Sequence, residues 1–436
     1  MDRVQDVGDR VAIIGAGWSG LAAAVSLAEG GVPVTVLEAS RSLGGRARRV
    51  TVDGTPLDNG QHILIGAYRE TLSLMRKVGA DPRELLLRTP LELRFAGGFH
   101  LRAPALPYPA NLLVALLAAR GLSAAEALAA IRFVLHLRKD GFRIDPDRSV
   151  AELLRARGQT GALSRHLWGP LCVSALNTSP GSASAQVFAH VIRDGLTGER
   201  GNSDLLLPRA DLGRLLPDPA AAYVAARGGS VETGVAVRLV ARDGDAFRLD
   251  DRPERFAGVV VACAPQNAAA LLAGIPGLEP VRRSIESLAY EPIYTCYLKY
   301  ADHIGLPAPM LGFTDGFIQW AFDRGRLSGM RGLIAAVASG PGAHQEWAHG
   351  AIAQKAHAEL AAVIRDLPAP DWTRTIAEKR ATFSCSPALS RPAAATGVPG
   401  LFLAGDYVAS DYPGTLEAAV KSGIAAARAV APQSST

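Results

Sequence analysis

Apolar and polar residues at the start of the chain follow the order typical of a strand, a turn and a helix. Residues 11–14 are wholly apolar, residues 15–20 are rich in glycine, and residues 21–30 carry the small apolar side chains of a buried helix. A second apolar run at 34–37 ends on Glu38. This spacing predicts a β-α-β unit with parallel strands.

Later segments predict that the chain returns to the same sheet and also builds a second one. A helix and a strand are expected over 220–237, a buried strand over 258–263, and a strand, a loop and a helix over 400–430. Between residues 293 and 383, runs such as IYTCYLKY and GLIAAVAS predict a separate, mostly antiparallel sheet. No internal repeat or low-complexity linker is present, so the domains are expected to interleave.

A strongly apolar stretch lies between these regions. Residues 103–119 are punctuated by proline, and a helical pattern follows from Ser123 with more apolar positions than one buried face needs. Two interpretations stay open. The stretch is either a helix of an inner domain or a hydrophobic rim, flanked by Arg102 and Arg120, that dips into a membrane.

Composition excludes several classes of protein. The 436 residues are 48% hydrophobic and 20% charged, which is ordinary globular usage. Mean hydropathy is +0.14, without an apolar run of about 18 residues that could span a bilayer. The first ten residues lack the pattern of a secretory signal, so a cytoplasmic protein is expected. The four cysteines form no CxxC pair, which supports neither a disulfide framework nor a metal site.

The net charge of +5 comes mostly from arginine, since only six of the 46 basic residues are lysine. The arginines are spread along the chain, and no basic stripe with interleaved aromatic residues is present. Nucleic-acid binding is therefore not expected. A weak attraction to phosphate or anionic lipid stays open.

The first motif with chemical content is Gly-x-Gly-x-x-Gly at Gly15, Gly17 and Gly20, between a strand and a helix. The glycines permit a tight turn, close approach of a pyrophosphate, and close helix packing. The helix N-terminus offers unpaired N–H groups to the phosphates. Glu38, at the end of the second strand, is placed to accept hydrogen bonds from ribose hydroxyls, which favours FAD or NAD over NADP. The alternative is an ordinary turn with incidental glycines.

The continuation at Gly44, Gly45 and Arg46 separates FAD from NAD, because this glycine pair and guanidinium can reach the pyrophosphate from its other side. Here the sequence resembles the flavoproteins with two dinucleotide-binding motifs of the amine oxidase and phytoene desaturase superfamily. Gly405-Asp406, after a strand near the C-terminus, resembles the second FAD motif of that superfamily. No Cys or His stands in a flavin-linking motif, so the FAD is expected to be non-covalent.

The resemblance implies a cofactor site assembled from distant segments. Residues 59–62 would run beside the flavin, and the last helix would direct its positive end at the flavin ring. The expected FAD-binding residues are Gly15, Gly17, Trp18, Ser19, Gly20, Glu38, Ala39, Gly44, Gly45, Arg46, Asn59, Gly60, Gln61, His62, Val237, Cys263, Ala264, Gly405, Asp406, Thr415, Leu416 and Ala418.

These motifs predict an α/β fold in which a Rossmann-like FAD-binding domain is interleaved with a mixed α+β substrate domain. The FAD-binding domain is expected to comprise residues 1–75, 213–282 and 398–436. The substrate-binding domain would comprise residues 76–212 and 283–397.

Several further segments resemble the bacterial hydroxysqualene dehydroxylases, also described as squalene-associated FAD-dependent desaturases. The segments are 167–178 (LWGPLCVSALNT), 183–188, 203–212, Gln319-Trp320, 378–383 and 412–417. The resemblance implies reductive removal of the hydroxyl of hydroxysqualene to give squalene, on a route to hopanoids. The allylic hydroxyl would leave as water, and N5 of reduced flavin would deliver hydride to the resulting cation. No second Gly-x-Gly-x-x-Gly is visible, so an external electron donor is expected.

This reaction would need an apolar tunnel for a long isoprenoid and a positioned acid. His62, Asp411 and Tyr412 are the candidate catalytic residues, because their segments should approach the flavin. His62 has a structural alternative as a hydrogen-bonded residue at a domain junction, and a flavin-bound water or ionisation of the substrate itself could replace all three. The aromatic residues that could line the tunnel, or simply fill the core, are Trp168, Phe188, Tyr290, Phe317, Trp320 and Phe322.

Two rival functions stay open. A carotenoid-type desaturase or an amine oxidase would use oxidised FAD in the opposite direction, and Tyr407 with Tyr412 leaves an aromatic amine-oxidase cage open. A prenyl-binding escort protein would share the fold without using flavin, which the intact Gly45-Arg46 and Gly405-Asp406 pairs argue against. The expected location is cytoplasmic, with the alternative of peripheral contact at the inner face of the membrane.

Overall fold

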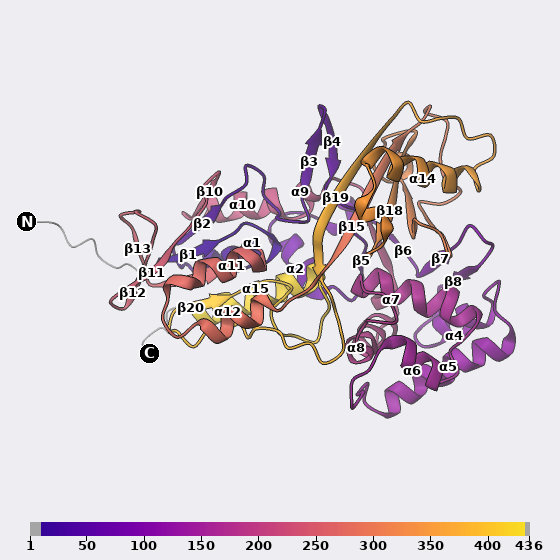
Figure 1. The fold of residues 1–436 in the computed structure, drawn as a ribbon, viewed down its shortest axis with the longest axis horizontal. Helices are drawn as coiled ribbons and strands as arrows, with labels where there is room; N and C mark the ends of the chain where they lie inside the picture. Colours follow the sequence, from indigo (N-terminus) through magenta and orange to yellow (C-terminus); the bar gives the residue numbers. More distant parts are fainter. Residues whose placement is uncertain (1–9, 432–436) are drawn as a thin grey trace, which may run out of the picture.

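The computed structural model describes residues 10–431 (Figure 1). The polar N-terminal segment, from which the sequence predicts no secretory signal, lies almost wholly outside the described residues. The same is true of the extreme ends of the expected FAD-binding domain, residues 1–9 and 432–436.

A five-stranded parallel sheet forms one half of the molecule. Its order is β10-β2-β1-β14-β20, and every neighbouring pair is parallel. The bounds are β1 Val11–Ile14, β2 Val34–Glu38, β10 Ser230–Thr233, β14 Gly258–Val261 and β20 Leu401–Leu403. Strands from three separate stretches of the sequence therefore build one sheet, and the predicted α/β fold is confirmed.

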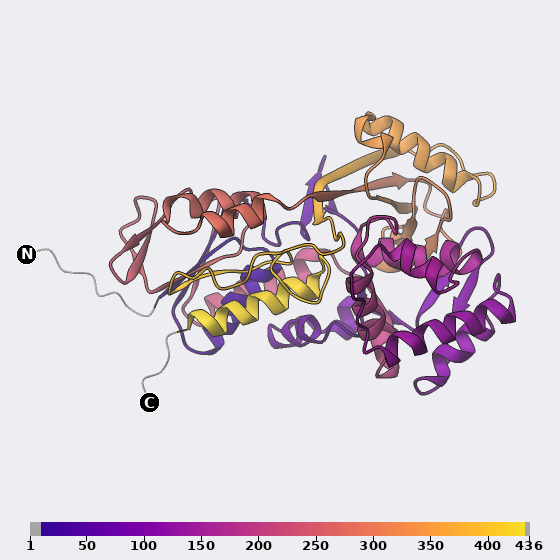
Figure 2. The same cartoon turned by 60° about the horizontal axis from the view of Figure 1, so that its bottom comes forward.

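Alternate residues of these strands belong to different hydrophobic clusters, because successive side chains point to opposite faces. Val11 and Ile13 pack with the helices α1 (Trp18–Glu29), α10 (Pro217–Ala225) and α15 (Leu416–Val430). Ala12 and Ile14 belong to the cluster that contains α11 (Pro265–Leu271) and α12 (Glu279–Glu286). Figure 2 shows α11 and α12 on the opposite side of the sheet from α15.

The second half contains a five-stranded antiparallel sheet in the order β16-β17-β18-β15-β19. This confirms the antiparallel sheet expected between residues 293 and 383. Its strands are β15 Tyr290–Lys299, β16 Met310–Gly312, β17 Trp320–Asp323, β18 Leu333–Ser339 and β19 Trp372–Phe383. The helix α14 (His349–Ala361) packs on β15 and β19.

A helical region covers the other side of this half (Figure 1). Its helices are α4 Ala110–Leu117, α5 Ala124–Lys139, α6 Val150–Ala156, α7 Gly169–Leu176 and α8 Ala185–Leu196. Capping boxes at Ser123 with Glu126 and at Ser149 with Glu152 fix the starts of α5 and α6. The apolar stretch 103–119 thus contains only one short helix, α4.

Smaller elements connect the two halves. The strands β5 Leu64–Ile65, β9 Leu205–Pro208 and β6 Leu86–Thr89 form one small sheet beside the helical region. The remaining elements are β3 Arg49–Val52, β4 Thr55–Asp58, α2 Arg69–Lys77, α3 Pro82–Leu85, β7 Glu92–Arg94, β8 His100–Arg102, η1 Ser164–Trp168, η2 Arg200–Ser203, α9 Leu212–Leu215, β11 Val240–Asp243, β12 Ala246–Leu249, β13 Arg255–Phe256, η3 Leu272–Gly274, α13 Arg324–Ser328 and η4 Ala343–Glu346.

Within residues 10–431, no helix has the length and apolar character needed to cross a bilayer. The four cysteines are all free thiols. No group of three His, Cys, Asp or Glu side chains in this part of the chain is arranged to hold a metal ion.

Candidate cofactor and substrate site

The predicted cofactor segments follow the carboxyl ends of the parallel strands. Gly15 follows β1, Glu38 ends β2, Val237 follows β10, Cys263 follows β14 and Gly405 follows β20. Because all five strands are parallel, these ends lie along one edge of the sheet. Ligands of open α/β sheets bind at this edge.

Two glycine-rich turns meet at this edge. Gly15 has φ +107°, and a Cβ there would lie 2.9 Å from the carbonyl carbon of Ala262. The backbones of Gly17 and Gly44 form an isolated β-bridge. Gly45 has φ +61°, and its Cβ would lie 3.2 Å from Cα of Gly17. Side chains at these positions would strain the backbone and fill the space through which a pyrophosphate would approach.

Glu38 is held at the end of β2 by main-chain donors. The amide of Ala16 donates to its Oε2 at 2.6 Å, and the amide of Ser40 donates to its Oε1 at 2.8 Å. The amide of Val235 donates to the Glu38 carbonyl at 2.9 Å, which brings the segment that contains Val237 to the same place. Each carboxylate oxygen keeps a lone pair for a further donor such as a ribose hydroxyl.

Arg46 and Asp406 form an ion pair at this edge, with Nη2 2.5 Å from Oδ1. Nη1 of Arg46 also donates to the carbonyl of Ala381 at 2.7 Å. Burial by itself lowers the pKa of Arg46, but the adjacent Asp406 carboxylate more than offsets this effect, so the pKa is raised. The structure therefore joins the Gly-Gly-Arg and Gly-Asp motifs, which the sequence analysis treats as separate contacts to FAD.

The segment 59–62 lies beside this pair. Nδ2 of Asn59 donates to the carbonyl of Arg46 at 3.0 Å and to Oε2 of Glu378 at 3.3 Å. Nε2 of Gln61 donates to Oη of Tyr297 at 2.8 Å. These bonds fix the backbone of the segment against the antiparallel sheet.

Behind this segment is a buried polar network that sequence reasoning missed. Nη2 of Arg324 lies 3.6 Å from Oδ2 of Asp58, and both side chains are buried. Tyr297 donates to the carbonyl of Asp58 at 2.8 Å. Burial raises the pKa of Asp58 to about 6, although Leu212 N–H and Arg324 oppose the shift. No local pattern points to it, because Asp58 follows only Pro56 and Leu57, and its partner Arg324 is distant in the sequence.

His62 is close to the same cluster, and its Nδ1 lies 3.4 Å from the carbonyl of Gly60. Burial lowers the pKa of His62 to about 4, and the charge of Arg46 contributes to this shift. The imidazole is therefore neutral near pH 7. A neutral imidazole is a much weaker acid than imidazolium, and His62 does not line the cavity described below.

An unpaired polar atom tests whether these residues suit a dinucleotide. The hydroxyl of Tyr407, directly after the Gly-Asp motif, is buried and has no hydrogen-bond partner. Buried hydroxyl groups normally have a partner. Together with the close-approaching glycines and the anchored Glu38, this free hydroxyl shows a site built for a polar ligand, and FAD suits it.

The helix α15 begins at the same edge, where Thr415 accepts a hydrogen bond from the amide of Ala418 at 3.2 Å. The positive end of this helix therefore lies after the Gly-Asp motif, as expected for Thr415, Leu416 and Ala418. Glu417 instead turns away and caps α2. It accepts bonds from the amides of Glu70 at 3.0 Å and Thr71 at 2.9 Å.

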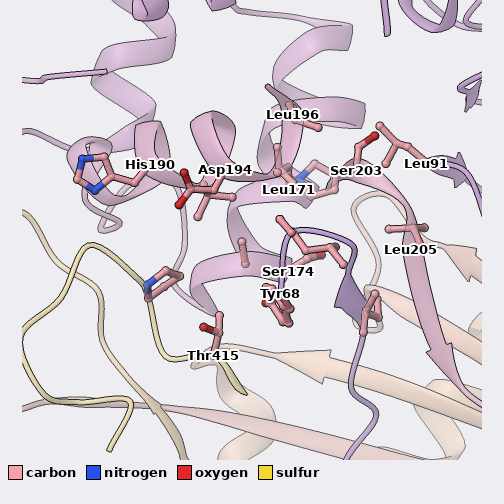
Figure 3. A pocket seen from close by; sticks show the side chains of 18 of the residues that line it. Tyr68, Leu91, Leu171, Ser174, His190, Asp194, Leu196, Ser203, Leu205 and Thr415 are labelled. Carbon is pink, nitrogen blue, oxygen red and sulfur yellow. The ribbon is translucent and has the colours of Figure 1, made fainter. Parts of the chain in front are cut away.

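A cavity lies between the helical region and the start of α15 (Figure 3), and its empty space, including the part open to solvent, is about 1210 Å³. Most of its walls are apolar and come from β5, β7, α7, α8 and β9. The polar residues that line it are Tyr68, Ser174, His190, Asp194, Ser203, Asp411, Tyr412 and Thr415. The cavity is thus an apolar chamber with polar groups in few places.

Asp411 and Tyr412, two of the three candidate catalytic residues, line this cavity. Nη2 of Arg193 lies 3.4 Å from Oδ2 of Asp411, and Nδ1 of His190 lies 3.3 Å from its carbonyl oxygen. Burial raises the pKa of Tyr412. Figure 3 shows His190 and Asp194 on one helix, across from Thr415.

Sequence reasoning missed His190, Asp194 and Ser174. His190 and Asp194 are four residues apart on α8, a spacing that places both on one helix face. This spacing is a signal that the sequence alone could have supplied.

Of the six aromatic residues that could line a tunnel or fill the core, one lines the cavity. Trp320 lines the cavity and donates from Nε1 to Oγ of Ser174 at 2.9 Å. Trp168 and Phe188 are instead buried in the core, with 1% and 0% of their surface exposed. Tyr290, Phe317 and Phe322 are also absent from the lining. The walls are aliphatic because leucine and isoleucine side chains from β5, β7 and α7 occupy them.

The sequence is similar to those of a known family and of named relatives. The family described as flavin containing amine oxidoreductase matches residues 18–431. The chain is 30% identical to a hydroxysqualene dehydroxylase of Rhodopseudomonas palustris, over 96% of this chain and 97% of that protein. It is 28% identical to a hydroxysqualene dehydroxylase of Sinorhizobium fredii, over 96% and 97% respectively.

Solved structures share the fold. Cyclohexylamine oxidase from Brevibacterium oxydans superposes with a TM-score of 0.70 at 18% identity, over 97% of this chain and 99% of that one. At this identity the likeness concerns the fold alone.

Proposed function

The chain belongs to the flavin containing amine oxidoreductase family and is an FAD-dependent oxidoreductase, and we propose that it removes the hydroxyl of hydroxysqualene to give squalene. The observation that carries this proposal is the aliphatic cavity beside the start of α15. Most of the residues that line it are apolar, and polar groups stand in few places. Such a chamber suits a long isoprenoid better than a small amine.

The proposed reaction exchanges a hydroxyl for a hydrogen. A proton adds to the allylic hydroxyl, the C–O bond breaks and water leaves. A hydride then adds to the allylic cation that remains. Reduced flavin supplies that hydride when it is bound. A bound isoprenoid would displace water from the aliphatic walls of α7, β5 and β9, which would protect the cation from capture.

We assign the source of this proton to the polar end of the cavity. Asp411 and Tyr412 line it, and Arg193 and His190 hold Asp411 in place. His62 is neutral near pH 7 and lies outside the lining, so its proposed part is to order the segment 59–62 beside the cofactor. Arg46, Asp406, Glu38 and the two glycine turns would hold FAD, with the other cofactor residues predicted from the sequence.

The proposal includes the division into two domains. Residues 1–75, 213–282 and 398–436 would bind FAD, since they supply every strand of the parallel sheet. Residues 76–212 and 283–397 would bind the substrate, since they supply α7 and α8 of the cavity wall. An external donor must reduce the flavin, and an apolar substrate of this kind places the enzyme at a membrane surface.

The test is anaerobic turnover of hydroxysqualene with chemically reduced FAD, with products separated by gas chromatography and identified by mass. Squalene should form only when both enzyme and reduced flavin are present. A yellow protein that leaves hydroxysqualene unchanged, yet consumes oxygen with polyprenes or amines, would overturn the proposal in favour of a desaturase or an amine oxidase.

A cavity variant sharpens this test. Ala175 lines the cavity, and Ala175→Phe would place a ring in it. We expect squalene formation to fall at least about tenfold while flavin content stays constant. Ala222→Phe, on the exposed side of α10, is the matched control and should leave both unchanged. Equal activity of the two variants would show that the cavity does not take part in the reaction.

A further inference from the structure

Large exposed hydrophobic side chains are concentrated in one small part of the surface. Residues 10–431 contain nine of them, and six lie within the stretch 106–135. These six are Leu106, Leu113, Val114, Leu117, Leu128 and Leu135, and the most exposed, Leu117 and Leu135, each show 57% of their surface. Single exposed leucines are ordinary, whereas a cluster of this kind marks an interaction surface.

Five of the six residues lie on the two helices, and Leu106 precedes α4. On α4, Leu113, Val114 and Leu117 lie on the outer face, while Asn111 and Ala115 are buried on the inner face. On α5, Leu128 and Leu135 are seven residues apart and so share a face. The helices pack against each other, and Figure 2 places them at the end of the molecule away from the parallel sheet.

Positive charge predominates in the segment that carries this face, although Arg102 lies 3.8 Å from Glu92 and Asp140 follows Lys139. Between residues 102 and 139 the cations are Arg102, Arg120, Arg132, Arg138 and Lys139, and the only acidic residue is Glu126. Glu126 accepts hydrogen bonds from the amide and hydroxyl of Ser123 in the capping box of α5. All five cationic residues are exposed.

The segment that carries these helices meets the cavity wall near its start. Leu112 and Leu116 of α4, and Leu91 and Leu93 of the cavity wall, all pack against the same large hydrophobic cluster. The amide of Ala103, at the start of the segment, donates to the carbonyl of Leu91 at 2.9 Å.

We infer that the outer face of α4 and α5 docks on an anionic lipid bilayer. Leucine side chains would enter the boundary between headgroups and acyl chains, and the surrounding arginine and lysine side chains would contact lipid phosphates. The charge excess favours a lipid surface over a second copy of this chain, because two copies would bring like charges together. The docking is inferred from this surface alone. That docking also brings the substrate to the enzyme rests on the proposed function.

The experiment is flotation of the FAD-loaded protein with vesicles of phosphatidylcholine, with and without about one third phosphatidylglycerol. We expect binding to the anionic vesicles, with at least tenfold less on neutral ones and a decrease at high salt. The triple variant Leu113→Ser, Leu117→Ser, Leu135→Ser should reduce binding to anionic vesicles at least tenfold. Arg120→Gln with Arg132→Gln should reduce it on anionic vesicles only.

The matched control is Leu239→Ser with Val363→Ser, two exposed hydrophobic residues outside the patch. It should float like the unaltered protein. Equal flotation of the patch variant and the control would overturn the inference. So would a dimer in light scattering that becomes a monomer only in the patch variant, since the occupant would then be a second copy.

Activity separates this inference from the proposed function. With substrate dispersed in detergent, the patch variant should turn over like the unaltered protein, and with substrate in vesicles it should be slower at least about tenfold. If no squalene forms under either condition but flotation behaves as expected, the proposed function fails and the docking surface stands.

Discussion

The Arg46–Asp406 ion pair joins two motifs that are 360 residues apart in the sequence. The Asp406 side chain is 8% exposed, and Arg46 is 32% exposed. Asp406→Asn would leave the guanidinium without its counter-charge, which we expect to cost about 2 kcal/mol. The purified variant should hold at least about tenfold less FAD, as measured by its visible absorbance.

Asp218→Asn is the control for this change, because Asp218 pairs with Arg49 where both side chains are nearly half exposed. Exposed ion pairs contribute little, so stability and FAD content should not change. Full retention of FAD in the Asp406→Asn variant would contradict the assignment of Asp406 to the cofactor site.

His62 makes stability depend on pH in a defined direction. Its pKa falls from 6.5 in the unfolded chain to about 4 in the folded one. The unfolded state therefore binds more protons between these values, and stability falls as pH drops from 6.5 towards 4, by about 2–3 kcal/mol. Urea unfolding of His62→Gln should show less loss over this window than the unaltered protein.

Asp58 acts in the opposite direction, because its pKa rises to about 6 from 3.8. The folded state binds the Asp58 proton more tightly than the unfolded state does. The contribution of Asp58 to the stability of the fold therefore decreases as pH rises through the same window. The His62→Gln variant and the unaltered protein both carry Asp58, so the difference between the pH slopes of their stability reports the contribution of His62. An identical pH slope for the two would show that His62 titrates normally.

At the scale of elements, α2 receives its cap from another helix. Its own N-cap residue, Tyr68, provides no side-chain cap, and Glu417 of α15 accepts from the amides of Glu70 and Thr71 instead. Glu417 is 2% exposed. Glu417→Gln removes a charge from a helix N-terminus and turns one acceptor into a donor, so we expect a loss of about 2 kcal/mol and a lower melting temperature.

Glu29→Gln is the control, since Glu29 pairs with Lys77 at the surface. It should melt at the same temperature as the unaltered protein. Because α15 also begins at the cofactor edge, the Glu417→Gln variant should bind FAD more weakly than the control does. Equal melting of both variants would show that the buried carboxylate contributes nothing to this junction.

Elements with a strong local pattern were predictable from the sequence. The β-α-β unit at residues 11–38, the return strand at 258–261 and the antiparallel sheet all stand where the apolar runs indicate. The partners of polar side chains were not predictable, because they depend on contacts between distant segments. Asp58 meets Arg324, and Asn59 meets Glu378, across more than 250 residues.

At the scale of the whole molecule, the same distinction explains the cavity. Trp168 and Phe188 look suited to a tunnel, but helix packing buries them in the core, while His190 and Asp194 reach the cavity from an ordinary amphipathic helix. An amphipathic pattern shows that a helix has two faces but not which of them meets a ligand. The motifs thus locate the cofactor edge, and only the assembled fold locates the cavity in which we propose that the substrate binds.

The loop between the Gly-Asp motif and α15 connects the cofactor edge with the cavity. Arg391 binds this loop at several points: its Nη1 donates to the carbonyls of Asp406 at 3.3 Å and Tyr412 at 2.9 Å, and its Nη2 donates to Oγ of Ser410 at 3.2 Å. The loop carries Asp411 and Tyr412 into the cavity. One planar guanidinium therefore fixes the cofactor motif and the proposed proton donors relative to each other.

Arg391→Lys keeps the positive charge but cannot reproduce the fork of donors. We expect FAD to stay bound, because Asp406 keeps its ion pair with Arg46. The loop should loosen at Ser410 and Tyr412, so KM for hydroxysqualene should rise and kcat should fall, with kcat/KM lower by about tenfold. Arg428→Lys, exposed near the end of α15, should leave these constants unchanged. If Arg391→Lys instead lost FAD and kept its KM, the arginine would serve the cofactor half alone, and the loop would not position the substrate.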